Sequence, residues 1–195
     1  PTLRLLCDAL GRAEAEAYLA ACEGSVPLSV TVNTCRTDRA ALLAAWQKAG
    51  IAARLSALTE DGILIDGAVS PAALPGFAEG LFFVQDEAAR LAVGLLAPKA
   101  GETVADACAA PGGKSFAAAV RMKGQGKVFA YELHESKLPL IESGAARLGL
   151  ACIHAAARDS RTPDPALVDR ADAVICDVPC SGMGVLRKTP MPEQG

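Results

Sequence analysis

The stretch Asp106-Ala-Cys-Ala-Ala-Pro-Gly-Gly-Lys114-Ser115 decides the fold predicted for this chain. It follows the β-prone run Glu102–Asp106 and leads into the apolar run Phe116–Val120, which indicates the start of a helix. Strand, glycine-rich turn and helix in this order form the first unit of a nucleotide-type α/β fold. Gly112 and Gly113 would let a ligand approach the backbone, and the amides that open the helix favour a carboxylate or a phosphate.

Two classes of ligand fit such a turn. A phosphate-binding P-loop is one, because Gly113-Lys114-Ser115 has the right ending and Val174-Ile-Cys-Asp177 could be a strand that ends in a magnesium-binding Asp. That pattern, however, requires glycine where this chain has Cys108, and Pro111 removes an amide from the phosphate cradle. A methionine-derived cofactor such as S-adenosylmethionine, which presents a carboxylate, is therefore favoured.

A second segment, Asp177-Val-Pro-Cys180-Ser-Gly-Met-Gly184, follows another short apolar strand. Its Pro-Cys pair would place a thiol at the carboxyl edge of the sheet, where open α/β folds bind their ligands. Most cysteines are instead buried as small hydrophobic residues. That is the interpretation for Cys7, Cys22, Cys152 and Cys176.

Four ordered motifs resemble those of the NOL1/NOP2/Sun family of RNA cytosine-C5 methyltransferases. They are the two segments above together with Phe83-Val-Gln85-Asp86-Glu-Ala-Ala and Gly184-Val-Leu-Arg187-Lys-Thr-Pro190. The resemblance covers the chain from around residue 25 to its end and is strongest to bacterial members that act on small-subunit (16S) ribosomal RNA. It implies a Rossmann-like α/β domain, S-adenosylmethionine as the cofactor and RNA as the substrate.

The resemblance also implies roles for acidic residues at successive strand ends. Glu132 would accept hydrogen bonds from the ribose hydroxyls, Asp159 would meet the adenine edge, and Asp177 would lie near the cofactor amino group and the target base. The implied catalytic residues are Cys180, Asp177 and Lys114. The implied cofactor-binding residues are Asp106, Cys108, Ala109, Ala110, Pro111, Gly112, Gly113, Lys114, Glu132, Asp159 and Asp177.

The chemistry of the family explains the thiol. Cytosine C5 is a poor nucleophile, so a cysteine thiolate first adds to C6. The family carries two such cysteines, an attacking one in a later Thr-Cys-Ser type motif and the Pro-Cys one that assists release of the product. This chain has Cys180 alone and stops at Gly195, which puts its own catalysis in doubt.

Two interpretations of this ending remain open. We favour a fragment whose attacking cysteine lies beyond Gly195; alternatively Cys180 is itself the nucleophile, as the Pro-Cys residue is in DNA cytosine-C5 methyltransferases. A catalytically silent domain that binds S-adenosylmethionine or RNA is the alternative function.

Composition sets the remaining expectations. The chain has 195 residues, 51% of them hydrophobic, without an apolar stretch of membrane-spanning length, and its seven cysteines lack metal-ligand spacing. We therefore expect a cytoplasmic protein with reduced thiols, no metal and no membrane contact. The net charge of −3 is low for an RNA-binding protein. Phosphate contacts would come from Arg187-Lys188, while the cluster of Arg121, Lys123 and Lys127 is either a second contact or a solvated face.

Residues 1–76 are predicted to form an N-terminal helix and a small α+β module that resembles the partial RNA-recognition-like module of the family. The helix is expected over Thr2–Ala21, and the order strand, helix, strand, strand follows from residue 25 to residue 66, with Asp38 capping the helix. Pro71–Gly76 is the predicted boundary. Residues 77–195 would then form the methyltransferase domain, with its carboxyl-terminal part missing.

Overall fold

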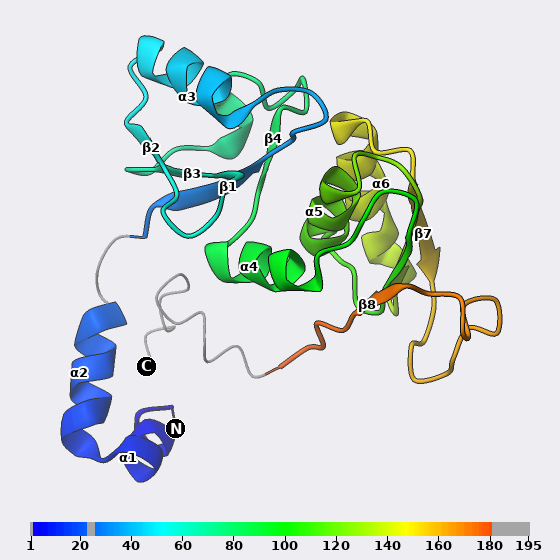
Figure 1. The fold of residues 1–195 in the computed structure, drawn as a ribbon. Helices are drawn as coiled ribbons and strands as arrows, with labels where there is room; N and C mark the ends of the chain where they lie inside the picture. Colours follow the sequence, from blue (N-terminus) through cyan, green and yellow to red (C-terminus); the bar gives the residue numbers. More distant parts are fainter. Residues whose placement is uncertain (1, 23–25, 181–195) are drawn as a thin grey trace. The chain divides into compact units, whose positions relative to one another are not determined.

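The structure is a computed structural model that describes residues 2–22 and 26–180. By contacts the chain divides into two compact units (Figure 1). One comprises Leu28–Val178 and holds both sheets, and the other includes the amino-terminal helices. Each unit is described by itself.

The amino-terminal residues form two helices where the sequence predicts one. Helix α1 spans Thr2–Leu10 and helix α2 spans Arg12–Cys22. Gly11 separates them with a φ of 81°, a left-handed conformation that ends a helix at little cost only for glycine. The predicted single helix was therefore wrong at this glycine.

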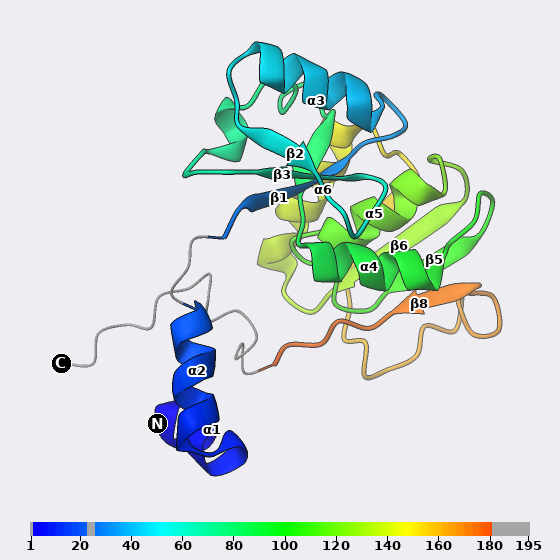
Figure 2. The same cartoon turned by 60° about the vertical axis from the view of Figure 1, so that its left-hand side comes forward.

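The first sheet is antiparallel and forms the small α+β module. Its strands are β1 (Leu28–Val32), β2 (Ala53–Leu55), β3 (Gly62–Ile65) and β4 (Phe82–Val84), in the order β2-β3-β1-β4. Helix α3 (Arg39–Lys48) covers one face, as Figures 1 and 2 show. The core of the module consists of Val30, Val32, Leu42, Trp46, Ile63, Ile65, Leu74 and Phe82.

The helix cap and the domain boundary predicted from the sequence can be compared with the structure of this module. Asp38 caps α3 as predicted, because its carboxylate accepts a hydrogen bond of 2.8 Å from the Ala41 amide. The segment Pro71–Ala73 forms a short 3-10 helix at the predicted boundary. Strand β4, however, lies beyond this boundary and pairs with β1, so the first sheet takes in residues assigned to the following domain.

The second sheet is parallel and matches the predicted Rossmann-like arrangement. Its strands are β5 (Thr103–Asp106), β6 (Lys127–Glu132), β7 (Ile153–Ala157) and β8 (Ala173–Ile175), in the order β7-β6-β5-β8. The pairings β5–β6, β5–β8 and β6–β7 are all parallel. Strand order therefore reverses beside β5, which is where open α/β sheets bind ligands.

Three helices share the core of this second sheet. They are α4 (Glu87–Leu96), α5 (Gly113–Arg121) and α6 (Leu138–Leu148). Val93, Phe116 and Ile141, one from each helix, belong to the same buried cluster as the strand residues Val104 and Val128.

Buried polar contacts join the two sheets into one unit. Arg90 of α4 has no exposed surface and donates to Ser29 Oγ of β1 at 2.5 Å and to Thr59 Oγ1 at 3.1 Å. Its Nε lies 4.0 Å from Asp61 Oδ1. A second contact involves Asn33, which follows β1. Its Nδ2 donates to the carbonyls of Gly80 and of Leu148, the last residue of α6, each at 2.9 Å. The small module is therefore fixed to the helices of the parallel sheet.

We expect Arg90→Leu to lower the free energy of unfolding by about 3 kcal/mol, because the buried Ser29 hydroxyl would lose its partner and Asp61 would lose one of its two nearby cations. Urea unfolding followed by the fluorescence of the single tryptophan, Trp46, measures this. Arg54→Leu is the control, since its ion pair with Asp66 is exposed and worth less than about 1 kcal/mol. Equal losses in the two variants would contradict the assignment.

Candidate functional site

Asp106 ends β5 and is the most buried acid of the candidate site. Its side chain is only 1% exposed, and Oδ2 accepts a hydrogen bond of 2.7 Å from Ser115 Oγ, in the first turn of α5. Burial raises the pKa of Asp106, while the Ser115 hydroxyl and the Cys108 amide oppose the rise. No donor among the described residues completes a hydrogen bond of normal geometry with the buried Oδ1.

The loop after Asp106 crosses the carboxyl edge of the sheet. The amide of Ala107 donates to Ile175 O of β8, and that of Ala109 donates to Tyr131 O of β6. Gly112 then adopts a φ of 113°, and a Cβ there would lie 2.3 Å from the Phe116 ring. A Cβ on Gly113 would approach only Gln85 Nε2, at 3.9 Å, so the two glycines serve different needs. Gly112 shapes the turn, and Gly113 leaves its surface open.

Glu132 ends the neighbouring strand, β6. Its side chain is buried, and Oε1 accepts a 3.1 Å hydrogen bond from the His134 amide. Lys137 Nζ lies 3.9 Å from the same oxygen. The backbone therefore orients this carboxylate at the sheet edge.

Asp159 follows β7 and has a partner that the sequence did not reveal. The Arg161 side chain donates to both carboxylate oxygens, the shortest contact being 2.6 Å from Nη2 to Oδ2, and the Arg161 amide donates to Oδ1. These bonds lower the pKa of Asp159 to about 2. Next to it, Ser160 Oγ donates to Ala107 O at 2.7 Å and ties this loop to the one after β5.

Asp177 follows β8 and is brought to the start of α5 by an ion pair. Lys114 Nζ lies 2.5 Å from Asp177 Oδ2. Both side chains line a cavity of about 230 Å³, whose other walls are α4 and β8, through residues that include Val93 and Ile175. The structure thus brings Asp177 to the segment that holds Asp106 and Lys114, although Asp177 lies 63 residues beyond Lys114 in the sequence.

The cysteines have separate environments. Cys180 is an exposed free thiol at the end of the described residues, and Cys176 is also exposed, although the sequence interpretation placed it in the core. Burial raises the pKa of Cys108 in the loop after β5, and the nearby Cys176 adds to the rise. The predicted RNA contacts Arg187 and Lys188 lie outside the described residues.

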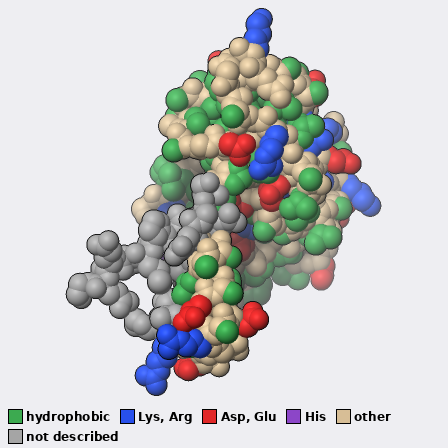
Figure 3. Space-filling model, turned by 90° about the vertical axis from the view of Figure 1, so that its left-hand side faces the viewer, with side chains coloured by type: hydrophobic (Ala, Val, Ile, Leu, Met, Phe, Trp, Pro, Cys, Tyr) green, Lys and Arg blue, Asp and Glu red, His purple; other side chains and the backbone are tan. Residues whose placement is uncertain are grey.

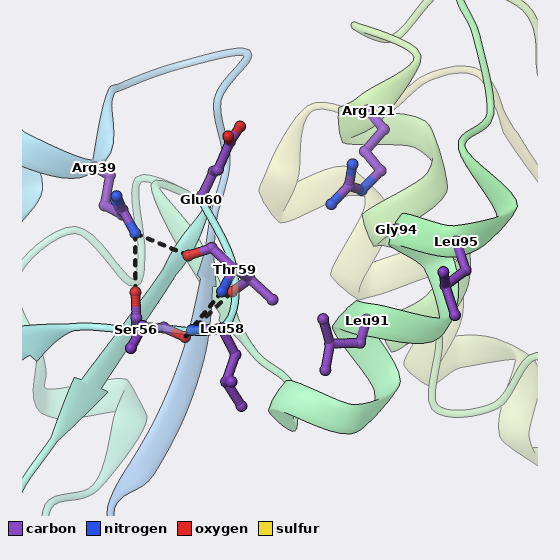
Figure 4. A pocket seen from close by; sticks show the side chains of 10 residues that line it. Arg39, Ser56, Leu58, Thr59, Glu60, Leu91, Gly94, Leu95 and Arg121 are labelled. Carbon is purple, nitrogen blue, oxygen red and sulfur yellow. Dashed lines mark hydrogen bonds between the residues drawn. The ribbon is translucent and has the colours of Figure 1, made fainter.

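A second cavity, of about 390 Å³, lies between the loop Ser56–Glu60 and helix α4 (Figure 4). Arg121 points from α5 toward this loop and lies 3.7 Å from Asp61 Oδ2. Arg121 thus has an acidic partner within the chain, whereas Lys123 and Lys127, from the same predicted cluster, are exposed. None of the residues that line this cavity belongs to the predicted cofactor set.

The surface charges, possible metal ligands and helix lengths can be compared with the expectations from composition. In the view of Figure 3, basic side chains are interspersed with acidic ones rather than gathered on one surface. Within residues 2–22 and 26–180, no group of His, Cys, Asp and Glu side chains could hold a metal ion. None of the helices in these ranges is long and apolar enough to cross a membrane.

Two domain families match the chain. Residues 93–192 match the family described as 16S rRNA methyltransferase RsmB/F. The chain belongs to this family. Residues 3–71 match the ferredoxin-like domain of RsmF/B-like methyltransferases. The matches confirm the resemblance drawn from the motifs, and they confirm a Rossmann-like domain preceded by a small α+β module.

Curated relatives of RsmB/F type are similar over most of this chain. The probable ribosomal RNA small subunit methyltransferase B of Bacillus subtilis is 41% identical over 164 residues, which cover 83% of this chain and 36% of the relative. The methyltransferase B of Vibrio cholerae is 36% identical over 165 residues, covering 84% and 38%. The methyltransferase F of Escherichia coli O157:H7 is 31% identical over 179 residues, covering 89% and 37%. The chain thus spans less than half the length of each of these relatives.

Solved structures agree with this membership. The crystal structure of PH0851 has a TM-score of 0.88 and 28% identity, and the match covers 96% of this chain and 43% of that one. A methyltransferase homolog protein from Pyrococcus horikoshii has a TM-score of 0.76 and 25% identity, covering 97% and 67%. The fold of this chain is therefore shared with these two solved structures, one of which is a methyltransferase homolog.

S-adenosylmethionine is the cofactor of RsmB/F-type methyltransferases, and the residues at the sheet edge fit it. The open surface at Gly113 leaves room for a ligand against the backbone. Asp106 Oδ1 is buried without a full hydrogen bond, and Glu132 presents an oriented carboxylate on the next strand. These acceptors suit the ammonium and hydroxyl groups of the cofactor.

The two loop glycines should tolerate alanine differently. Gly112→Ala is expected to lower the free energy of unfolding by about 2 kcal/mol, because it combines a left-handed φ with a collision with Phe116. Gly113→Ala, in the first turn of α5, should be neutral or stabilising by up to about 1 kcal/mol. Urea unfolding of the two variants side by side tests this. A greater loss for Gly113→Ala would refute the roles given to the glycines.

Proposed function

We propose that this chain binds S-adenosylmethionine at the carboxyl edge of its parallel sheet and belongs to an enzyme that methylates C5 of cytosine in small-subunit ribosomal RNA. One observation carries the cofactor site. Acids end β5 and β6 and follow β8 at the carboxyl edge of the sheet, where strand order reverses between β5 and β8, and the Gly112–Gly113 turn opens α5 beside them. The match to the 16S rRNA methyltransferase RsmB/F family supports the substrate.

Each acid has a distinct part in this proposal. Glu132 accepts hydrogen bonds from the ribose hydroxyls, and Asp159 meets the adenine edge. The loop from Cys108 to Gly113 and the first amides of α5 receive the carboxylate of the cofactor. Asp106 receives its ammonium group through the buried Oδ1. Arg161 keeps Asp159 ionised, so this residue acts as an acceptor.

The residues that follow β8 are assigned to the target cytosine. When bound, the cofactor supplies an electrophilic methyl group. A cysteine thiolate adds to C6 of cytosine, and the electron pair of the C5–C6 double bond becomes available at C5. After methylation a base removes the C5 proton, and the C6–S bond breaks to restore the double bond and the thiolate. Asp177, held by Lys114, faces the amino group of the base, and Cys180 assists release of the product.

The cofactor assignment predicts that isothermal calorimetry will detect saturable binding of S-adenosylmethionine to this chain. Glu132→Ala should weaken the affinity by about 10- to 100-fold, because hydrogen bonds to a charged group are lost. Glu135→Ala, an exposed glutamate three residues further on, is the matched control and should leave the affinity unchanged. Binding of ATP with magnesium in place of S-adenosylmethionine would contradict the proposal and favour a P-loop.

The base assignment has its own test. A small-subunit ribosomal RNA transcript is incubated with the enzyme and methyl-labelled S-adenosylmethionine and then digested to nucleosides. We expect the label in 5-methylcytosine, and label in any other nucleoside would exclude cytosine C5 as the target.

A further inference from the structure

Gln85 connects the small module to the Gly112–Gly113 turn, the proposed cofactor turn. It follows β4, its side chain is 6% exposed, and its backbone amide donates to Ser29 O of β1 at 3.1 Å. The side-chain amide accepts a hydrogen bond of 2.8 Å from Thr31 Oγ1 and donates one of 3.0 Å from Nε2 to Gly113 O. One buried side chain thus spans the distance between β1 and the first residue of α5.

The chemistry of these three groups fixes the orientation of the amide. Gly113 O can only accept, so the NH₂ group of Gln85 must face it. The amide oxygen must then face Thr31, whose hydroxyl has a proton to donate and no exposed surface. The donors run in one direction, from Thr31 to Gln85 to Gly113, and such a chain strengthens each of its bonds.

The Gly113 carbonyl opens the hydrogen-bond ladder of α5, and Gln85 adds a bond to it from outside the helix. Glycines have more conformational freedom than other residues, and neither Gly112 nor Gly113 has a side chain that packs. Gly113 O belongs to the peptide group that joins Gly113 to Lys114. The hydrogen bond from Gln85 therefore restrains, together with the first turn of α5, the peptide group that carries the Lys114 amide and the side chain that reaches Asp177.

We propose that Gln85 is a positioning residue that preorganises the Gly112–Gly113 turn for its ligand, and that Thr31 sets the orientation of the Gln85 amide. This inference rests on the proposed function, because the ligand is the S-adenosylmethionine assigned there. A turn that is already ordered loses less conformational entropy when the ligand binds, so the affinity rises without any contact between Gln85 and the ligand.

The test is calorimetry with S-adenosylmethionine on four variants, each first checked for cooperative urea unfolding. Gln85→Leu, which removes both bonds, should weaken the affinity by about tenfold or more, and Thr31→Val should weaken it less. Gln47→Leu, an exposed glutamine of α3, is the control and should bind like the unaltered chain. Amide hydrogen exchange should also become faster from Lys114 to Phe116 in Gln85→Leu.

Gln85→Glu tests the positioning role through the pH dependence of the affinity for S-adenosylmethionine, which a purely structural role of Gln85 would leave unchanged. An ionised carboxylate would repel Gly113 O, whereas a protonated carboxyl can donate to it and still accept from Thr31. Burial raises the pKa of such a carboxyl group. The affinity of the Gln85→Glu variant for S-adenosylmethionine, relative to that of the unaltered chain, should therefore recover as the pH falls from about 8 to about 6.

Three outcomes are distinguishable. If the unaltered chain binds no S-adenosylmethionine, the proposed function fails and this inference fails with it. If the chain binds but folded Gln85→Leu binds equally well, the positioning role alone is overturned. A Gln85→Glu variant whose relative affinity does not change with pH would also overturn it.

Discussion

The parallel pairing of β5 on both of its sides is the constraint on which the candidate site depends. Hydrogen bonds join β5 to β6 along one edge and to β8 along the other. Because parallel strands end at the same edge, the residues that follow them meet there although they are distant in sequence. A slip of one residue in the register would turn Asp106 to the opposite face, away from Ser115. The acids, the glycine turn and the start of α5 are therefore positioned together.

The electrostatics of this edge favour one class of ligand over another. Among the described residues, two ammonium groups lie close to the carboxylates of Asp106, Glu132 and Asp177, and each is already paired with one of them. Lys114 is paired with Asp177 and Lys137 lies near Glu132. The excess of carboxylates would repel the phosphates of a nucleoside triphosphate. It suits a ligand that carries a sulfonium and an ammonium group, while the amides that open α5 accommodate a carboxylate. The charge of this edge thus favours S-adenosylmethionine over a nucleoside triphosphate, as the presence of Cys108 and Pro111 in the loop does.

Local patterns could be predicted, whereas contacts between distant segments could not. The strand, turn and helix around Gly112 and the cap at Asp38 depend on neighbouring residues, so the sequence indicated both. Strand β4 has only three residues, and its place in the first sheet follows from pairing with β1, some fifty residues earlier. The hydrogen bonds from Arg161 to Asp159 depend on a loop conformation that no periodic sequence pattern predicts. Such pairings arise from tertiary packing rather than from propensity.

Gln85 shows how a motif can be recognised before its physical role is visible. It belongs to one of the motifs that resemble the family, yet its partners Thr31 and Gly113 lie 54 and 28 positions away. The strand before it completes the sheet of the small module, and its side chain reaches the cofactor turn of the parallel sheet. A division of the chain after Gly76 would separate Thr31 from the amide that it orients. The small module is therefore a structural part of the proposed cofactor site.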